Sequence, residues 1–381
     1  MGAPGERRKL LSKKKDVDVY VTSYGLIQRD LELFEPITFS YLILDEAQAI
    51  KNKETRNARS VKQLNALNRL VLTGTPIENS LEDLWSLFDF LMPGFLGSHE
   101  RFSQMYMRAG SFDSEKALEF LKRKIAPFVL RRMKQDVLED LPPITHSIYH
   151  CYLHDEQRKI YQKAAKRARE ELQDLVEKKG FDKARLHVLA TLTRLKQICC
   201  HPSLIGEREE VHSAKYEMLK DLIGGLLDTG HKTVLFSQYT KMLKIIKDDL
   251  DKEGIPYLYL DGATKNRQAL VRQFNKDEKI PLFLISLRAG GQGLNLVGAD
   301  SVIHYDMWWN PAVENQATDR VWRMGQKTKV SSYKLVTKGT IEEKILDLQN
   351  RKKDLISDLV ECDDDVLSKL TWEDVLTLLR T

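Results

Sequence analysis

The stretch Tyr41-Leu-Ile-Leu-Asp-Glu-Ala-Gln48 places two carboxylates directly after four consecutive apolar residues. A short apolar run of this kind is typical of a strand that is buried on both faces of a parallel sheet. Ligands of open α/β sheets bind at the carboxyl ends of such strands. A carboxylate there can hold Mg²⁺ through water and its neighbour can polarise an attacking water, as phosphoryl transfer requires. The alternative interpretation is an ordinary helix amino-terminal cap.

Two further stretches before residue 80 have the pattern of strands. Asp16–Thr22 alternates apolar and other residues, and Arg69–Thr73 is a short apolar run that leads into Gly74 and Thr75. Helical patterns separate these stretches, and strands that alternate with helices are typical of a parallel α/β sheet. The loop Thr73-Gly74-Thr75 suits sensing of a phosphate or a neighbouring carboxylate, although the same residues suit a simple turn.

From about Ser80 to Ser213 the pattern is mainly helical. One apolar seam runs along a long helix that ends at Gly180, and a second helix runs from about Asp182 to Cys200, so the two predict a helical hairpin. The seam comprises Tyr161, Ala165, Ala168, Leu172 and Leu175. Basic residues on the other faces of the first helix are either a solvated surface or a ridge that faces phosphates; they are Lys159, Lys163, Lys166, Arg167 and Arg169.

A second α/β pattern begins at Lys215, and a long helix from Ile341 follows its last strand. Five strands are predicted, at Lys232–Phe236, Tyr257–Leu260, Leu282–Ser286, Ser301–Tyr305 and Val330–Val336. Because Lys215–Val360 contains all five, we predict that this segment closes its own core. The first α/β block, with about three strands, looks incomplete by comparison.

Two motifs of the second block carry donors for phosphate. Ser286-Leu-Arg-Ala-Gly-Gly-Gln-Gly293 follows a predicted strand, and its glycines let backbone N–H groups approach an anion closely. Gln316, Arg320 and Arg323 recur at spacings of four and three, which predicts one helix face rich in donors. Surface ion pairing with Glu314 or Asp319 is the alternative interpretation of the two arginines.

Composition excludes some classes of protein. The 381 residues are 42% hydrophobic and 30% charged, enough apolar material for about two domains of roughly 150 residues each. No uncharged apolar run approaches the ~18 residues of a membrane span, and the basic amino terminus lacks the apolar region of a secretory signal. The net charge of +5 permits a polyanionic partner without requiring one.

Cysteine usage predicts reduced thiols. None of the four cysteines forms a C-x-x-C pair, which is typical of a protein in a reducing compartment. Cys199-Cys200-His201 suggests a metal site at first sight, but adjacent cysteines lack the usual ligand spacing and Cys199 continues an apolar helical pattern. We therefore interpret this group as buried and structural.

The order of these motifs resembles that of the SWI/SNF-type family of helicase-like DNA translocases, within helicase superfamily two. The resemblance covers the chain from about Val17 to its carboxyl terminus. It is carried by Asp45–Asn52, Leu72–Asn79, Leu84–Pro93, Phe128–Val137, Leu192–Pro202 and Asp319–Gln326. It implies an α/β fold of two RecA-like lobes, the first incomplete and the second complete, with an α-helical insertion between them and a carboxyl-terminal bracing helix at Ile341–Val360.

The resemblance also implies a division of the chain and a set of site residues. The segments would be 1–79 (first lobe), 80–213 (insertion), 214–340 (second lobe) and 341–381 (bracing helix and tail). Catalytic roles fall on Asp45, Glu46, Gln316, Arg320 and Arg323, with Asp45 also holding Mg²⁺ through water. Coupling of nucleotide to DNA falls on Thr73, Gly74, Thr75, Gly291 and Gly293. DNA contacts fall on Ser237, Gln238, Asp261, Gly262, Ser286, Arg288, Gly290 and Trp309.

The function implied is a DNA-dependent ATPase, with ATP and Mg²⁺ as cofactors, that translocates on double-stranded DNA and remodels or displaces DNA-bound proteins. No membrane is expected as a partner. The protein would be nuclear in a eukaryote and cytoplasmic, near the nucleoid, in a bacterium or archaeon. The alternatives are an inert nucleic-acid-binding remnant of such a motor and an RNA helicase of the same superfamily.

Several positions depart from the family pattern. The carboxylate box reads DEAQ where many relatives have DEGH, Leu287 replaces a threonine, and Trp322 replaces a histidine between the two arginines. The phosphate-binding loop G-x-x-x-x-G-K-[ST] is missing before Asp45, and Gly225–Thr233 is only a near match, because His231 interrupts it. We therefore expect a missing amino-terminal motor segment, supplied by the full-length protein or by another polypeptide.

Overall fold

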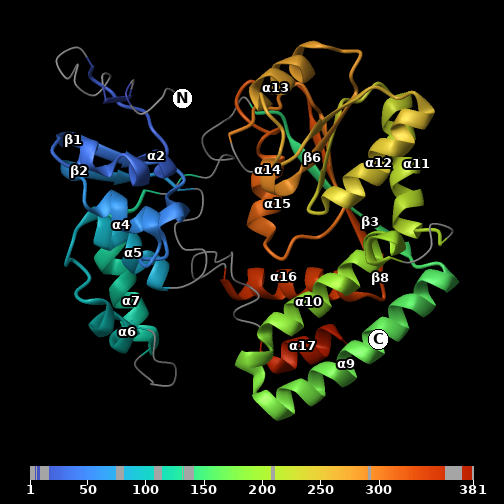
Figure 1. The fold of residues 1–381 in the computed structure, drawn as a ribbon, viewed down its shortest axis with the longest axis horizontal. Helices are drawn as coiled ribbons and strands as arrows, with labels where there is room; N and C mark the ends of the chain where they lie inside the picture. Colours follow the sequence, from blue (N-terminus) through green and yellow to red (C-terminus); the bar gives the residue numbers. More distant parts are fainter. Residues whose placement is uncertain are drawn as a thin grey trace. The chain divides into compact units, whose positions relative to one another are not determined.

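The computed structural model describes residues 17–73, 81–106, 114–130, 141–206, 211–290, 293–356 and 371–379, together with residues 5, 7, 8 and 132. The chain divides into two compact units (Figure 1), Met1–Arg131 with Ile356–Asp364, and Arg132–Leu355 with Asp365–Thr381. The boundary near residue 131 falls within the predicted segment 80–213. The division into four segments is not tested by these two units and stays a prediction.

The first unit combines a small parallel sheet with short helices. Its strands are β1 (Thr38–Leu44) and β2 (Asn65–Val71), which pair in parallel. Its helices are α2 (Tyr24–Arg29), α3 (Leu31–Phe34), α4 (Arg56–Lys62), α5 (Leu81–Leu91), α6 (His99–Tyr106) and α7 (Ser114–Ile125), with 3₁₀ turns η2 (Ala47–Ile50) and η3 (Ala126–Phe128). One core joins α2, α4 and α5 to the sheet, and a second joins α5, α6 and α7.

The strand predicted at Asp16–Thr22 is wrong. Residues 17–22 have no strand geometry, and the described residues of the first sheet are those of β1 and β2. The apolar residues of the alternation face solvent, since Val19 is 74% and Val21 94% exposed. Alternation predicts a strand only where a neighbouring strand satisfies the backbone, and no strand of the described residues does so here.

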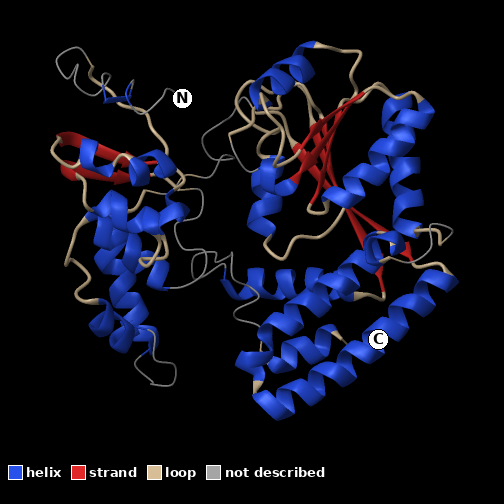
Figure 2. Cartoon of the chain, in the orientation of Figure 1, coloured by secondary structure: helices blue, strands red, loops and turns tan. Residues whose placement is uncertain are grey.

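The second unit is built on a six-stranded parallel sheet with helices on both faces (Figures 1 and 2). The strand order is β3-β8-β7-β4-β6-β5. The strands are β3 (Ile144–Tyr152), β4 (Thr233–Ser237), β5 (Tyr257–Leu260), β6 (Leu282–Ser286), β7 (Ser301–His304) and β8 (Val330–Lys338). All five strands predicted after Lys215 are confirmed. β4, β6 and β7 are buried along their whole length, as expected of central parallel strands.

The edge strand β3 was missed by sequence reasoning. It lies within the segment 80–213, which the pattern predicts as mainly helical, and it pairs with β8 from Ile144 with Val330 to Tyr152 with Lys338. Polar residues such as His146 and Ser147 hide it, because an edge strand has no continuous apolar run. The prediction that Lys215–Val360 closes its own core is therefore wrong, since the sheet takes one strand from outside that segment.

Helices cover the second sheet on both faces. On one face α11 (Ala214–Asp228) and α12 (Thr240–Glu253) pack on the sheet, and on the other α13 (Arg267–Lys276) and α15 (Pro311–Thr318) do so. The short α14 (Leu287–Gly290) follows β6, and η4 (Pro202–Ile205) leads toward α11. Gly290 and Gly298 are the tight points of this unit, because a Cβ at either would lie 2.8 Å from a neighbouring carbon.

The predicted helical hairpin is confirmed. It consists of α9 (Asp155–Lys179) and α10 (Phe181–Cys200), which lie side by side (Figure 1). Tyr161, Ala165, Ala168 and Leu172 of the predicted seam are buried, together with the first turns of α16 (Ile341–Ile356) and with α17 (Trp372–Leu378). Cys199 and Cys200 are 0% exposed, and His201 accepts a hydrogen bond from the Ser203 backbone N–H through Nδ1 (3.2 Å). Their predicted burial is confirmed.

Candidate nucleotide and nucleic-acid site

The carboxylate pair lies where the sequence predicts it, directly after β1. Asp45 is exposed and its Oδ1 accepts a hydrogen bond from the Glu46 backbone N–H (2.9 Å), while Glu46 Oε2 accepts one from Gln48 Nε2 (2.7 Å). Glu46 has φ 50° and ψ 53°, the left-handed conformation that residues with a side chain rarely adopt. Strain of this kind is often stored at functional sites, so it supports a functional role for this turn.

The ends of β1 and β2 are joined by two backbone hydrogen bonds. The Leu72 N–H donates to the Leu44 carbonyl (2.8 Å), and the Ala47 N–H donates to the Leu72 carbonyl (3.1 Å). The start of the predicted coupling loop at Thr73 is therefore anchored beside the carboxylates. Gly74 and Thr75 lie outside the described residues, so their predicted roles stay predictions.

Tyr24 is a neighbour of the carboxylates that sequence reasoning missed. Its hydroxyl, at the start of α2, donates to the Asp45 carbonyl (2.9 Å). Burial, and then the negative charges of Asp45 and Glu46, raise the pKa of Tyr24 to about 12, so the phenol stays protonated and remains a donor. No motif marks this tyrosine; only the packing of α2 against the sheet brings it here.

In the second unit the predicted DNA-contacting residues gather at one edge of the sheet. β4, β6 and β7 end together there, since Ser237 lies in register with Ser286 and Phe236 with His304. Asp261 and Gly262 follow the neighbouring strand β5. Because all strands are parallel, residues distant in sequence meet at this carboxyl edge.

Asp306 organises this edge, and sequence reasoning missed it. Its carboxylate accepts hydrogen bonds from the Ser237 hydroxyl, from the Gln238 backbone N–H (3.1 Å) and from Gln238 Nε2 (2.9 Å). Ser237 is 1% and Asp306 3% exposed, so the Ser237 side chain faces the interior rather than solvent. Burial raises the pKa of Asp306, and its hydrogen bonds and Lys196 oppose that shift. The rule that pointed to Asp45, a carboxylate just after a buried strand, would also have found Asp306.

The Asp261-Gly262 turn is closed by its own side chains. Asp261 Oδ1 accepts from the Ala263 N–H (2.9 Å) and from the Thr264 hydroxyl (3.1 Å), and the Tyr259 hydroxyl donates to Oδ2 (3.2 Å). Burial alone would raise the pKa of Asp261, but these hydrogen bonds outweigh it and hold the pKa below its usual value. Gly262 is exposed in this turn and its backbone is accessible from solvent.

The glycine-rich motif begins as a short helix rather than as a loop. Ser286 ends β6 and is 5% exposed, and α14 follows immediately. A Cβ at Gly290 would lie 2.8 Å from Phe236 Cε1, so the close packing of α14 on β4 requires glycine. Gly293 has φ 57°, in the left-handed region. The Arg288 side chain and Gly291 lie outside what the structure describes.

The prediction of one helix face for Gln316, Arg320 and Arg323 is wrong. Gln316 lies on α15, but that helix ends at Thr318, and both arginines lie in the turns that follow. These turns are held by the segment that follows the glycine-rich motif. The Leu296 N–H donates to the Arg320 carbonyl (2.8 Å), and the Arg323 guanidinium donates to the Leu294 carbonyl (3.2 Å). All three side chains are half-buried, and their predicted catalytic roles stay predictions.

Trp322, one of the departures from the family pattern, has a structural partner. Its Nε1 donates to the Pro142 carbonyl (2.8 Å), just before β3 begins. The indole therefore ties the turn that carries both arginines to the start of the edge strand. A tryptophan with a buried body and a satisfied N–H is a common anchor of this kind.

Trp309 is half-buried and packs against the core of the helical hairpin. Gln349 of α16 donates through Nε2 to the Trp308 carbonyl (2.8 Å) and to the Trp309 carbonyl (3.4 Å). The Lys196 ammonium group of α10 lies 5.1 Å from the centre of the Trp309 ring. The tryptophan predicted to meet DNA is thus positioned by helices rather than by the sheet.

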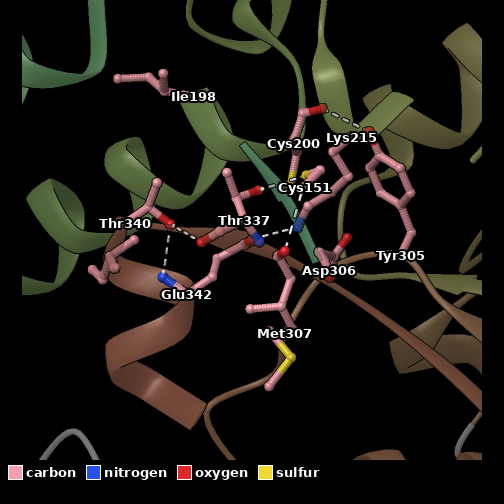
Figure 3. A network of polar contacts seen from close by, with 12 residues as sticks. Cys151, Ile198, Cys200, Lys215, Tyr305, Asp306, Met307, Thr337, Thr340 and Glu342 are labelled. Atoms are coloured by element: carbon pink, nitrogen blue, oxygen red, sulfur yellow. Dashed lines mark hydrogen bonds and ion pairs between the residues drawn. The ribbon is translucent and has the colours of Figure 1, made fainter. Parts of the chain in front are cut away.

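A buried ionic network joins α11 and α16 of the second unit (Figure 3). Lys215 and Glu342, both with fully buried side chains, form an ion pair, and the Thr337 N–H also donates to Glu342 Oε2 (2.9 Å). The Tyr305 hydroxyl, one residue after β7, donates to the Cys200 carbonyl at the end of α10 (2.6 Å). Burial opposes the charge of Lys215, but Glu342 reverses this effect and raises the pKa of the ammonium group.

This fold and these strand-end motifs define a class, the helicase-like ATPases with α/β lobes. The model of the SNF2-related domain matches residues 5–204, and that of the helicase conserved C-terminal domain matches residues 214–325. The chain therefore belongs to the SNF2-related, or SWI2/SNF2-type, family. The predicted family and fold class are confirmed.

Three relatives illustrate the match. The chain is 36% identical to human TATA-binding protein-associated factor 172 over 437 residues, covering 99% of this chain and 24% of the relative. It is 35% identical over 380 residues to an uncharacterized ATP-dependent helicase of Mycoplasma pneumoniae, covering 99% and 36%. A solved structure, the Sulfolobus solfataricus SWI2/SNF2 ATPase core in complex with dsDNA, is 35% identical with a TM-score of 0.51, covering 96% and 78%. The chain thus spans well under half of these two curated relatives.

Among the described helices, none is long and apolar enough to cross a membrane.

Proposed function

We propose that this polypeptide is part of a DNA-dependent ATPase that translocates on double-stranded DNA and remodels or displaces DNA-bound proteins. The observation that carries the proposal is the pair of exposed Asp45 and half-buried Glu46, held in a strained turn at the end of β1 beside the start of the Thr73 loop. Membership of the SNF2-related family supports it, and one relative is an ATPase core solved with dsDNA.

The residues present fit ATP and Mg²⁺. Asp45 and Glu46 offer carboxylate oxygens at a strand end, and Mg²⁺ takes oxygen ligands, usually one or two carboxylates together with water and phosphate oxygens. Bound Mg²⁺ would neutralise charge that develops on the transferred phosphoryl group. Glu46 would orient the attacking water, and Gln316, Arg320 and Arg323 would supply donors for the phosphates.

The carboxyl edge of the second sheet would meet DNA. Gly262 and Trp309 would contact the sugar-phosphate backbone, and Gln238 would be held for this by Asp306. Gly290, which the sequence also predicts to contact DNA, is instead buried against Phe236. Such contacts are directed at phosphate, so binding is largely independent of base sequence. The protein partner displaced from DNA would be recognised by parts of the full-length protein, which would act in a nucleus or beside a bacterial nucleoid.

We expect the chain to bind random duplex DNA weakly, with Kd of roughly 10⁻⁴–10⁻⁶ M at physiological salt, because phosphate contacts release condensed counterions. Fluorescence anisotropy at two salt concentrations measures this, and affinity should fall steeply at the higher one. Trp309→Ala should weaken binding, whereas Trp372→Ala, at a half-buried tryptophan of α17, is the matched control.

In the same samples, phosphate release with ATP, Mg²⁺ and DNA should stay at background, because the sequence lacks the phosphate-binding loop and its lysine. Binding that is absent at low salt would refute the DNA role. Tighter binding to duplex RNA than to DNA would favour the RNA-helicase alternative. Clear ATP turnover would show that the chain does not need the missing phosphate-binding loop.

A further inference from the structure

Lys196 is an unusual residue of α10. It is 1% exposed, and within the described part of the chain its ammonium nitrogen has no hydrogen-bond partner. Its neighbour is the Trp309 ring, whose centre lies 5.1 Å from the nitrogen. Burying an ammonium group without hydrogen bonds costs free energy, so other interactions must stabilise the Lys196 charge at this position. The face of an aromatic ring is one of the few partners that attract a cation there.

Burial lowers the pKa of the Lys196 ammonium group, and Asp306 is the acidic group that opposes this shift most. Lys196 in turn favours the ionised form of Asp306. Donors reach both Asp306 oxygens, as expected of a carboxylate, since the Ser237 hydroxyl donates to Oδ2 and Gln238 Nε2 to Oδ1. The Lys196 ammonium group therefore lies over the Trp309 ring and also acts electrostatically on the carboxylate that holds Gln238.

These contacts link the inserted hairpin to the carboxyl edge of the sheet. Trp309 and Asp306 lie on one short segment after β7, and its Trp308 and Trp309 carbonyls are held by Gln349 of α16. The helices thus hold this segment by two contacts, the Lys196 ammonium group over the Trp309 ring and the Gln349 amide on the two tryptophan carbonyls. The sheet holds its other end through Gln238 and Ser237.

We propose that Lys196 is a positioning residue, through which the α9–α10 hairpin holds Trp309 and the Asp306-bound Gln238 in the arrangement that meets DNA. This inference rests on the proposed function, because it assumes that Trp309 and Gln238 face DNA. Lys196 touches no ligand itself and acts through the ring and the carboxylate. A change in the hairpin would reach the DNA-facing segment by this route.

The first test uses the full chain labelled with 5-fluorotryptophan, with the Trp309 resonance assigned from Trp309→Phe. We expect Lys196→Met to move the Trp309 fluorine resonance and to weaken binding of random duplex DNA on the order of tenfold, the size of a desolvated cation–π contact. In a Trp309→Phe background the same substitution should change affinity less than in the wild type. An unmoved resonance, or an equal loss of affinity in both backgrounds, would overturn the inference.

Further variants separate positioning from simple stability. Lys196→Met leaves Asp306 without its counter-charge and can unfold the unit, so Lys196→Met/Asp306→Asn, which neutralises both, is the second variant. This double variant should fold, with the Trp309 fluorine resonance still displaced and the affinity for DNA still reduced. Full recovery of the resonance and of the affinity would show that Lys196 only balances the charge of Asp306. Lys215→Met/Glu342→Gln is the matched control, because it neutralises a second buried pair that contacts Tyr305 and not Trp309. If the wild-type chain binds no DNA, the proposed function fails, and the fluorine resonance alone then decides the inference.

Discussion

Glu342→Gln should destabilise the second unit strongly. Glu342 and Lys215 are both completely buried, and Glu342 Oε2 accepts from the Lys215 ammonium group and from the Thr337 N–H (2.9 Å). Glutamine keeps the volume of the side chain and leaves no cavity, so the substitution isolates the charge. It leaves the Lys215 ammonium group buried without a counter-charge, beside the Tyr305 ring at 5.7 Å.

The magnitude follows from which partner is removed. Removing one member of a buried ion pair costs about 3–5 kcal/mol, because the other charge stays desolvated. The glutamine oxygen can still accept one of the two hydrogen bonds, so we expect the lower end, about 3 kcal/mol. Lys215→Met/Glu342→Gln should be more stable than Glu342→Gln, since it removes both charges.

Native-state hydrogen exchange of peptides from β8 and α16 reports the opening of this unit alone. A loss of about 3 kcal/mol corresponds to exchange roughly a hundredfold faster at the slowest amides. Glu171→Gln, which removes an exposed partner of Arg167 on α9, is the control and should change nothing measurable. A loss below about 1 kcal/mol in Glu342→Gln, or a double variant less stable than the single one, would refute the reasoning.

Two further predictions concern the sheet of the second unit. Gly290→Ala should destabilise it by about 1–3 kcal/mol in urea unfolding, because the new Cβ would lie 2.8 Å from Phe236 Cε1. Gly224→Ala, on a helix with open space around it, is the control and should be neutral or stabilising. Equal effects of the two substitutions would contradict the packing argument. His304 is buried and donates to or accepts from the Thr318 hydroxyl (2.8 Å), and burial followed by the charge of Lys334 lowers its pKa to about 3. The unfolded chain then binds more protons than the folded one between about pH 6.5 and pH 3, so the contribution of His304 to stability falls as pH falls through that window, by about 2 kcal/mol from pH 7 to pH 5. Urea unfolding at both pH values should show this loss in the wild type and a smaller one in His304→Gln; equal losses would show that His304 is not its source.

Much of the fold was predictable because its signals are local. The apolar runs of β4, β6 and β7, the seam of α9 and the turn at Gly180 each depend on residues close together in the chain. The carboxylates of Asp45 and Glu46 were found because they directly follow an apolar run, although the predicted burial of that run is wrong, since Tyr41 is 63% and Ile43 53% exposed. The family resemblance was readable for the same reason, since each motif is a short continuous string.

Other features were decided only by the tertiary structure. The alternating residues 17–22 form no strand, whereas the polar stretch 144–152 becomes β3, because pairing with β8 and not local pattern determines which backbone is satisfied. The arginines at 320 and 323 leave the helical register because α15 ends at Thr318 and hydrogen bonds to Leu294 and Leu296, just after the glycine-rich motif, hold the turns.

The buried ionic groups show the difference most clearly. From composition, Lys196, Lys215 and Glu342 are ordinary charged helix residues, and charged residues usually lie at the surface. Their burial requires partners 113 positions away for Lys196 with Trp309, and 127 positions away for Lys215 with Glu342. The sequence by itself determined the motifs, the family and the strand ends that carry the candidate site residues. Only the folded chain decided which buried charges meet, because the free energy of a buried charge depends on its neighbours in space.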